Sequence, residues 1–250
     1  MFRLIILLLL VFPNLLFAAD FKTITFPSED GLAVTADLYL SHPKTAPFIV
    51  LFHQAQWSRG EYREIAPKLT NLGFNSMAVD QRSGQEVNGV VNATFKEAEK
   101  AGKQTTYPDT LEDMEAAVKY ARANYAEGKL ILWGSSYSAS LVIKLAGDNP
   151  ALAEGVVAFA PGEYFDKFGK GNTFVTQSAK SVICPVFITS ARSEKDLWSS
   201  IFEAIPSKNK VSFLPDMEGE HGSRALWQSK PAHKEYWAVL IPFLKQFTAR

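Results

Sequence analysis

The sequence predicts an α/β fold, with a mostly parallel central sheet flanked by helices on both faces. Segments with the pattern of buried strands alternate along the chain with segments of helical periodicity. Several strand segments are continuously apolar, as is typical of parallel strands that are covered on both faces. The chain has 250 residues, with no internal repeat and no linker-like stretch. We therefore expect one domain over residues 20–250.

The first half of the chain supplies the first four predicted strands. Alternating apolar and polar residues predict an antiparallel pair at 21–26 and 32–40, joined by a turn at Asp30-Gly31. Unbroken apolar runs predict buried strands at 47–52 and 74–79.

Helices are predicted between and after these strands. A helix over residues 62–72 places its apolar side chains on one face and stops at Gly73. Residues 81–107 form a long polar connection, in which 93–101 is compatible with a short helix; connections of this length are more often functional than idle. A helix over 109–125 has four apolar residues in register.

The second half continues the alternation. An apolar strand at 130–133 is followed by an almost wholly apolar helix at 138–146 and a strand at 155–160. Residues 163–181 are irregular, and they form either a cap over a cleft or an ordinary excursion with one short helix. The remaining expected elements are strands at 185–190 and 210–214 and helices at 197–204 and 237–247.

Charge and composition narrow the classes of partner. The chain has 26 basic and 26 acidic residues, and this balance does not favour binding to nucleic acid or to an anionic membrane surface. The 18 Phe, 8 Tyr and 5 Trp suit a globular core with an apolar cleft. The single cysteine, Cys184, excludes an internal disulfide, and we interpret it as a small buried hydrophobe.

Residues 1–19 have the pattern of a secretory signal peptide. A short basic start is followed by an unbroken apolar run from Leu4 to Phe12 and by small residues before Asp20. The alternative is an uncleaved membrane anchor, for which Pro13 makes the run short. We expect an exported, periplasmic or secreted protein with no stable membrane span after cleavage.

The segment from the strand at 130–133 to the following helix carries the strongest functional signal. Gly134 and Ser136 stand two residues apart, as in the G-x-S-x-G turn that exposes a nucleophilic serine at the end of a strand. The helix that follows directs its N-terminus at the place where negative charge develops. The fifth position is Ser138 instead of glycine, a change that we expect the turn to tolerate. The alternative is a glycine–serine turn without chemistry.

Five segments at strand ends carry a resemblance to a known family. The five segments are Phe52-His53-Gln54-Ala55, Asp80-Gln81-Arg82-Ser83-Gly84, Gly134-x-Ser136-x-Ser138, Ala191-Arg192-Ser193-Glu194 and Gly219-Glu220-His221-Gly222. With these segments the chain resembles the α/β-hydrolase superfamily, and within it the exported serine hydrolases similar to dienelactone hydrolases. The resemblance covers nearly all of the chain after residue 19 and implies the α/β-hydrolase fold, with the order Ser, acid, His.

The resemblance implies a role for each catalytic residue. Ser136 would be the nucleophile, where dienelactone hydrolases themselves carry a cysteine, and His221 would be the base that activates it. His53 would have a structural role. Glu194 would be the acid that orients the imidazole, with Asp196 as the alternative; both carboxylates also suit the start of the following helix.

The remaining implied site residues bind the oxyanion and the substrate. The oxyanion hole would combine the N–H of Tyr137 with that of Ala55 or Gln54, and Gln54 replaces a glycine that is common in the family. Trp57 and Phe165, together with Tyr137, suggest an apolar acyl pocket, although aromatics near turns are more often core residues.

These features together predict a serine hydrolase that cleaves small-molecule carboxylic esters through an acyl-enzyme intermediate. No metal or organic cofactor is implied, because no ligand-spaced histidine pair and no glycine-rich phosphate loop is present. The alternatives are an amide or peptide hydrolase with the same residues, and a non-catalytic binding protein that kept the fold. The sequence makes no prediction of the oligomeric state.

Overall fold

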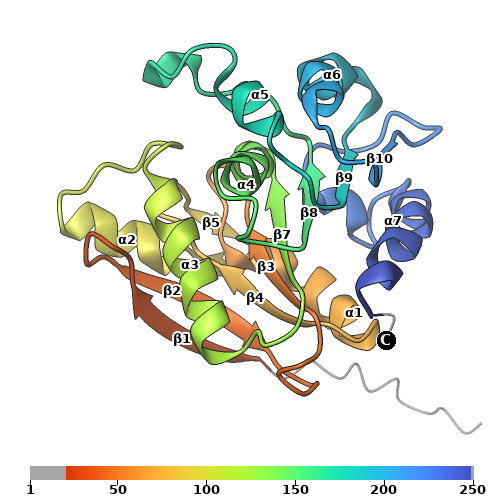
Figure 1. Ribbon diagram of the computed structural model, residues 1–250. Helices are drawn as coiled ribbons and strands as arrows, with labels where there is room; N and C mark the ends of the chain where they lie inside the picture. Colours follow the sequence, from red (N-terminus) through yellow and green to blue (C-terminus); the bar gives the residue numbers. More distant parts are fainter. Residues whose placement is uncertain (1–20, 249–250) are drawn as a thin grey trace, which may run out of the picture.

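A mostly parallel eight-stranded sheet runs through the protein (Figure 1), as the computed structural model of residues 21–248 shows. The predicted signal peptide, residues 1–19, lies outside the described residues. The strand order is β1-β2-β4-β3-β7-β8-β9-β10, in which β2 pairs antiparallel with β1 and β4 and all other pairs are parallel. The strands are β1 (Lys22–Pro27), β2 (Ala33–Tyr39), β3 (Phe48–Phe52), β4 (Asn75–Val79), β7 (Leu130–Ser135), β8 (Gly155–Phe159), β9 (Val186–Thr189) and β10 (Lys210–Phe213).

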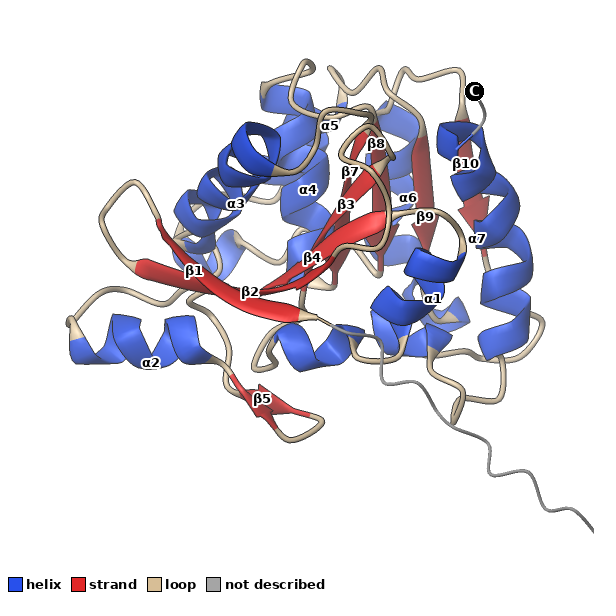
Figure 2. Ribbon diagram, turned by 90° about the horizontal axis from the view of Figure 1, so that it is seen from below, coloured by secondary structure: helices blue, strands red, loops and turns tan. Residues whose placement is uncertain are grey.

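Helices cover both faces of this sheet, which confirms the predicted fold class. Figure 2 shows α1 and α7 on one face and α3 and α4 on the other. The helices are α1 (Ile65–Asn71), α2 (Ala93–Lys100), α3 (Thr110–Asn124), α4 (Tyr137–Asp148), α5 (Phe174–Ala179), α6 (Lys195–Ala204) and α7 (His233–Thr248).

Strand β3 shows how one short segment serves two cores. Phe48, Val50 and Phe52 pack into the core beneath α3 and α4, whereas Ile49 and Leu51 pack into the core beneath α1 and α7. All five side chains are fully buried. Because successive side chains of a strand point to opposite faces, a strand covered on both sides has to be apolar throughout.

Three local expectations differ from the structure. The helix expected at 62–72 is divided into a 3₁₀ turn, η1 (Arg59–Tyr62), and α1. The connection 81–107 contains α2 as expected, and also a hairpin of β5 (Glu86–Val87) and β6 (Val90–Val91) that was not predicted. The turn between β5 and β6 is Asn88-Gly89, both with positive φ, and this pair is the sequence signal for such a turn. Helix α7 begins at His233, four residues before the expected start.

The strand register brings the predicted site segments to one edge of the sheet. Phe52 at the end of β3 lies opposite Gly134 of β7, and Ser135 of β7 lies opposite Phe159 of β8. The loop after β3 and the turn after β7 are therefore neighbours, as expected for the carboxyl ends of adjacent parallel strands. Within residues 21–248, no helix combines the length and the apolar character needed to span a membrane.

Candidate active site

The turn between β7 and α4 holds Ser136 in a strained backbone conformation. Its φ is 59° and its ψ is −124°, a combination that non-glycine residues rarely adopt. The Ser136 N–H donates to the Phe159 carbonyl at 2.7 Å, which fixes the turn against β8. Ser136 is partly exposed, whereas residues 130–135 and 137–143 on either side are buried. The turn therefore presents one hydroxyl-bearing side chain at the sheet edge, in the manner of a nucleophile elbow.

The small residues around Ser136 are explained by close packing. A Cβ on Gly134 would lie 2.3 Å from the Ser138 carbonyl oxygen, so a side chain cannot be accommodated there. Ser138, which replaces the expected glycine, uses its hydroxyl: it donates to the His53 carbonyl at 2.6 Å and accepts from the Gln81 amide at 2.5 Å. The departure from the family pattern thus connects α4 to the loop after β3.

His221 and Glu194 are brought together from two different loops. His221 Nδ1 is hydrogen-bonded to Glu194 Oε1, and the two side chains are 30% and 18% exposed. Glu194 Oε2 also accepts from the Ala191 N–H at 3.1 Å, which orients the carboxylate. The alternative acid, Asp196, is an exposed residue in the first turn of α6. The structure therefore pairs Glu194 with His221.

Two side chains hold the loops of Glu194 and His221 side by side. The Arg192 N–H donates to the Glu218 carbonyl at 2.7 Å, and the Ser193 N–H donates to the Glu218 carboxylate at 3.1 Å. The Tyr236 hydroxyl of α7 donates to the Ser190 carbonyl at 3.0 Å and accepts from the Glu220 N–H at 3.3 Å. The loop that carries His221, here called the histidine loop, is thereby fixed to the end of β9.

The histidine loop also lies directly against the elbow. The Ser223 N–H donates to the hydroxyl of Ser135, the residue before Ser136, at 2.8 Å. The Ser223 hydroxyl accepts from the Trp133 indole of β7 at 2.9 Å. The segment that carries His221 thus contacts both the elbow of Ser136 and the loop of Glu194.

The predicted oxyanion-hole residues divide into two kinds. Within residues 21–248, neither the Tyr137 N–H nor the Ala55 N–H is hydrogen-bonded to another protein group. Tyr137 is the first residue of α4, where N–H groups have no partner inside the helix. The Gln54 N–H instead donates to Glu61 Oε2 at 2.8 Å and is not free to bind a substrate. Of the two donors considered in this loop, only Ala55 is available.

Comparisons with known proteins identify the family and the fold of the chain. A sequence profile described as "Serine aminopeptidase, S33", of a hydrolase family, matches residues 43–200, which is more than half of the chain. The chain belongs to this α/β-hydrolase family. A search of curated protein sequences gave no match.

Solved structures with the same fold include several hydrolases. An esterase of Pyrococcus furiosus, Pf2001, is 19% identical with a TM-score of 0.71, over 92% of this chain and 93% of the other. A dienelactone hydrolase of Anabaena variabilis is 11% identical with a TM-score of 0.70, over 93% and 100%. Est1E of Butyrivibrio proteoclasticus, solved with ferulic acid bound, is 11% identical with a TM-score of 0.70, over 91% and 100%. At these identities the similarity establishes the fold of this hydrolase.

His53 of the hydrolase is a buried structural residue, as the sequence suggested. Its Nδ1 donates to the Gln54 carbonyl at 2.8 Å, and its Nε2 accepts from the Gln81 N–H at 3.0 Å and from the Asn92 amide at 3.1 Å. Burial lowers the pKa of His53 to about 4, so the ring stays neutral near pH 7. A neutral ring with both nitrogens engaged shapes the loop after β3.

The two aromatic residues expected at the acyl pocket lie in different surroundings. Phe165 is fully buried in the core beneath α4, where it contacts Tyr107 edge to face at 6.5 Å and Phe174 at 5.1 Å. Trp57 is half-buried and stacks on Trp227 at 5.4 Å. Of the two, Trp57 is partly exposed and Phe165 is not.

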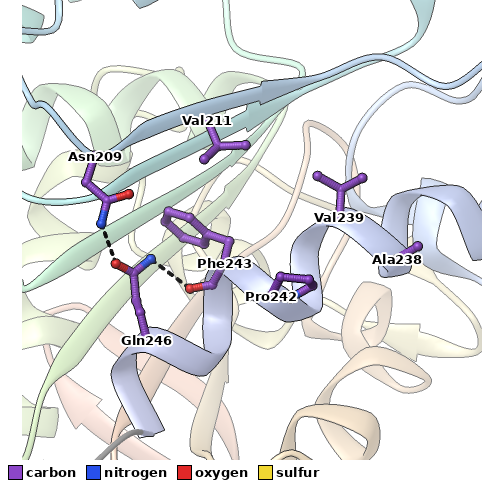
Figure 3. A pocket seen from close by; sticks show the side chains of 7 residues that line it. All are labelled: Asn209, Val211, Ala238, Val239, Pro242, Phe243 and Gln246. Carbon is purple, nitrogen blue, oxygen red and sulfur yellow. Dashed lines mark hydrogen bonds between the residues drawn. The ribbon is translucent and has the colours of Figure 1, made fainter.

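A groove between β10 and α7 is separate from these residues. Figure 3 shows it between β10 and α7, with Val211, Val239 and Phe243 among its lining side chains and Asn209 bonded to Gln246 at its rim. None of the predicted site residues lines it. Among residues 21–248, no cluster of three or more His, Cys, Asp or Glu side chains is arranged to hold a metal ion.

Proposed function

We propose that this hydrolase cleaves carboxylic esters, with Ser136 as nucleophile, His221 as general base and Glu194 as the acid that orients it. The bond between His221 Nδ1 and Glu194 is the observation that carries the proposal. A carboxylate at Nδ1 accepts a proton from that nitrogen and so favours the tautomer in which Nε2 is unprotonated, which a general base requires.

The proposed reaction has two acyl-transfer steps. His221 Nε2 takes the Ser136 hydroxyl proton as the serine oxygen attacks the ester carbonyl. The Tyr137 and Ala55 N–H groups donate to the resulting oxyanion. The C–O bond to the leaving alcohol then breaks, and the alcohol takes the proton from His221. Water attacks the acyl-enzyme in the same way, with His221 again as base, and releases the carboxylic acid and free Ser136.

Two carboxylates in the loops that follow β8 and β10 are already engaged, which favours esters over N-terminal peptides. An aminopeptidase has to bind a substrate ammonium group, for which an unpaired carboxylate is suited. Glu220 is bound to Arg224 and Lys230, at 3.1 and 3.2 Å. Glu163 accepts from the N–H groups of Val175 and Thr176 at the start of α5. These engaged carboxylates support an ester substrate, while the family description keeps aminopeptidase activity as the second candidate.

Turnover of matched substrates tests the proposal. We expect the p-nitrophenyl ester of a short acyl chain to be hydrolysed with a kcat/KM at least about 100-fold above that of the p-nitroanilide of the same acid and of leucine p-nitroanilide. Replacement of Ser136 by alanine should lower kcat by about 10⁴-fold or more. Preference for leucine p-nitroanilide would favour the aminopeptidase, and folded protein that hydrolyses none of them would favour a binding protein.

We also propose that the protein is exported, on the signal-peptide pattern of residues 1–19. Mass measurement of the protein recovered from the periplasm or medium of an expressing cell tests this. Loss of the first 18 or 19 residues supports export, and an uncleaved chain in the membrane fraction supports the anchor.

A further inference from the structure

Glu61 is a buried carboxylate that the proposed mechanism does not use. It lies in η1, eight residues after His53, and its side chain is fully buried. Within residues 21–248, it has no lysine or arginine in ion-pair contact. A buried carboxylate without a cationic partner is costly, so its hydrogen bonds should indicate what it does.

Each carboxylate oxygen of Glu61 binds a different catalytic segment. Oε2 accepts from the Gln54 N–H at 2.8 Å, in the loop that contributes Ala55 to the oxyanion hole. Oε1 accepts from the Ser135 hydroxyl at 2.7 Å, next to Ser136. The Ser135 hydroxyl in turn accepts from the Ser223 N–H at 2.8 Å, two residues after His221.

The main chain around Glu61 is itself held rigidly. The Glu61 carbonyl accepts from the Trp227 indole at 2.9 Å. A Cβ on Gly60 would lie 2.3 Å from the Val87 carbonyl oxygen, so η1 packs tightly under the β5–β6 hairpin. Because its main chain is fixed in this way, the Glu61 side chain can set the relative positions of the segments to which it is hydrogen-bonded.

We infer that Glu61 is a positioning residue. Its carboxylate fixes the loop of Gln54 and Ala55 and, through Ser135, the loop of His221 relative to Ser136. The inference rests on the proposed function. It also explains why the Gln54 N–H is unavailable to a substrate: that bond sets the direction of the next N–H, at Ala55. Gln54 and Ser135 both donate to the carboxylate, so its ionised form, which accepts at both oxygens, fits this arrangement.

Burial acts against that ionised form. It raises the pKa of Glu61 to about 7, although the bonds from Ser135 and Gln54 and the nearby His221 lower it. The titratable groups that face Glu61 are His221, from the loop after β10, and its neighbour Tyr62. Burial raises the pKa of Tyr62 well above 10, so this phenol stays neutral.

Two substitutions test the inference, with a matched control. Glu61→Gln keeps the shape but has one acceptor oxygen, and Ser135→Ala removes the link to Ser223. Ser140→Ala is the control. Ser140 lies on α4, the same helix as Tyr137, is equally buried, and its hydroxyl is hydrogen-bonded to the backbone of Gly162. Thermal unfolding of each variant establishes that it is folded.

The kinetic result expected is a loss in kcat without a matching change in KM. Both test variants should lower kcat for the ester by about 10- to 100-fold and change KM by less than about threefold, because misaligned catalytic groups affect the transition state most. The control should stay within about threefold of the wild type in both constants. Wild-type kcat in the folded test variants, or an equal loss in the control, would overturn the inference. Should Glu61→Gln not fold, Ser135→Ala decides.

Amide exchange gives a second result that does not depend on activity. Hydrogen–deuterium exchange in peptides that cover residues 53–58 should be faster in Glu61→Gln than in the wild type, because the acceptor of the Gln54 N–H is weakened. Unchanged exchange would contradict the inference even if activity falls. If the wild type hydrolyses no ester, the proposed function fails, and the exchange result alone decides whether Glu61 holds this loop.

Discussion

The buried carboxylate of Glu61 predicts an unusual dependence of stability on pH. Its pKa rises from an ordinary value of 4.5 to about 7 in the folded protein, mainly because burial penalises the charge. A group whose pKa is raised on folding makes its full contribution to the free energy of unfolding at pH values below its unfolded pKa. This contribution is lost as the pH rises through the folded pKa. At about 1.4 kcal/mol for each pKa unit, the difference between the unfolded and folded pKa values of Glu61 corresponds to about 3 kcal/mol in the free energy of unfolding.

The Glu61→Gln substitution isolates this contribution, since glutamine does not titrate. The free energy of unfolding of the variant, relative to the wild type, should rise by about 2.5 kcal/mol between about pH 5 and pH 8.5. Urea unfolding followed by tryptophan fluorescence at both pH values measures it. Subtracting the wild type at each pH removes the other titrating groups. A relative stability that is the same at both pH values within about 0.5 kcal/mol would refute the reasoning.

Three further predictions concern the residues around the site. Glu194→Gln should lower kcat/KM for the ester by at least about 100-fold, whereas Asp196→Asn should leave it within about threefold, in steady-state assays. Gly222→Ala should lower the free energy of unfolding by about 1–2 kcal/mol, measured by urea unfolding, because φ is +72° and the new Cβ would lie 2.5 Å from the Ser135 hydroxyl. Phe165→Ala should cost about 3–5 kcal/mol of stability and leave KM nearly unchanged, as expected of a core residue; a large rise in KM with unchanged stability would instead place Phe165 in the pocket.

The eight strands of the central sheet could be located along the chain, because each of their segments follows a local pattern. The apolar run of β3 feeds two cores, so it requires a hydrophobic residue at every position, and that pattern is visible without a structure. Short elements depend on their neighbours instead. Gly60 of η1, which precedes α1, packs against Val87 and Val90 of the β5–β6 hairpin, a contact between residues distant in sequence.

The pairing of Glu194 rather than Asp196 with His221 depends on rotation around a helix. Glu194 ends a 3₁₀ turn, and Asp196 lies two residues later in the first turn of α6. Residues two apart on a helix point in different directions, so only one of them can face His221. The sequence places both carboxylates at the correct loop but does not determine the exact start of the turn.

Glu61 could not have been identified from the sequence. It follows Gly60 and precedes Tyr62 in a segment with the pattern of a helix start, and no motif distinguishes it from a solvated glutamate. Its importance arises from bonds to Gln54 and Ser135, which are 7 and 74 residues away in sequence. The sequence shows that Gln54 stands where family members often have glycine, in the loop that Glu61 binds. It does not show which group accepts the hydrogen bond of the Gln54 N–H.

Covalent labelling tests most directly the claim that Ser136 is a nucleophile activated by His221. The protein is treated with a fluorophosphonate probe beside Ser136→Ala and His221→Ala, and the modified peptide is sequenced by mass spectrometry. We predict that the wild type is labelled at Ser136 and that neither variant is labelled. Folded wild-type protein that stays unlabelled, or a label on another residue, would contradict the account.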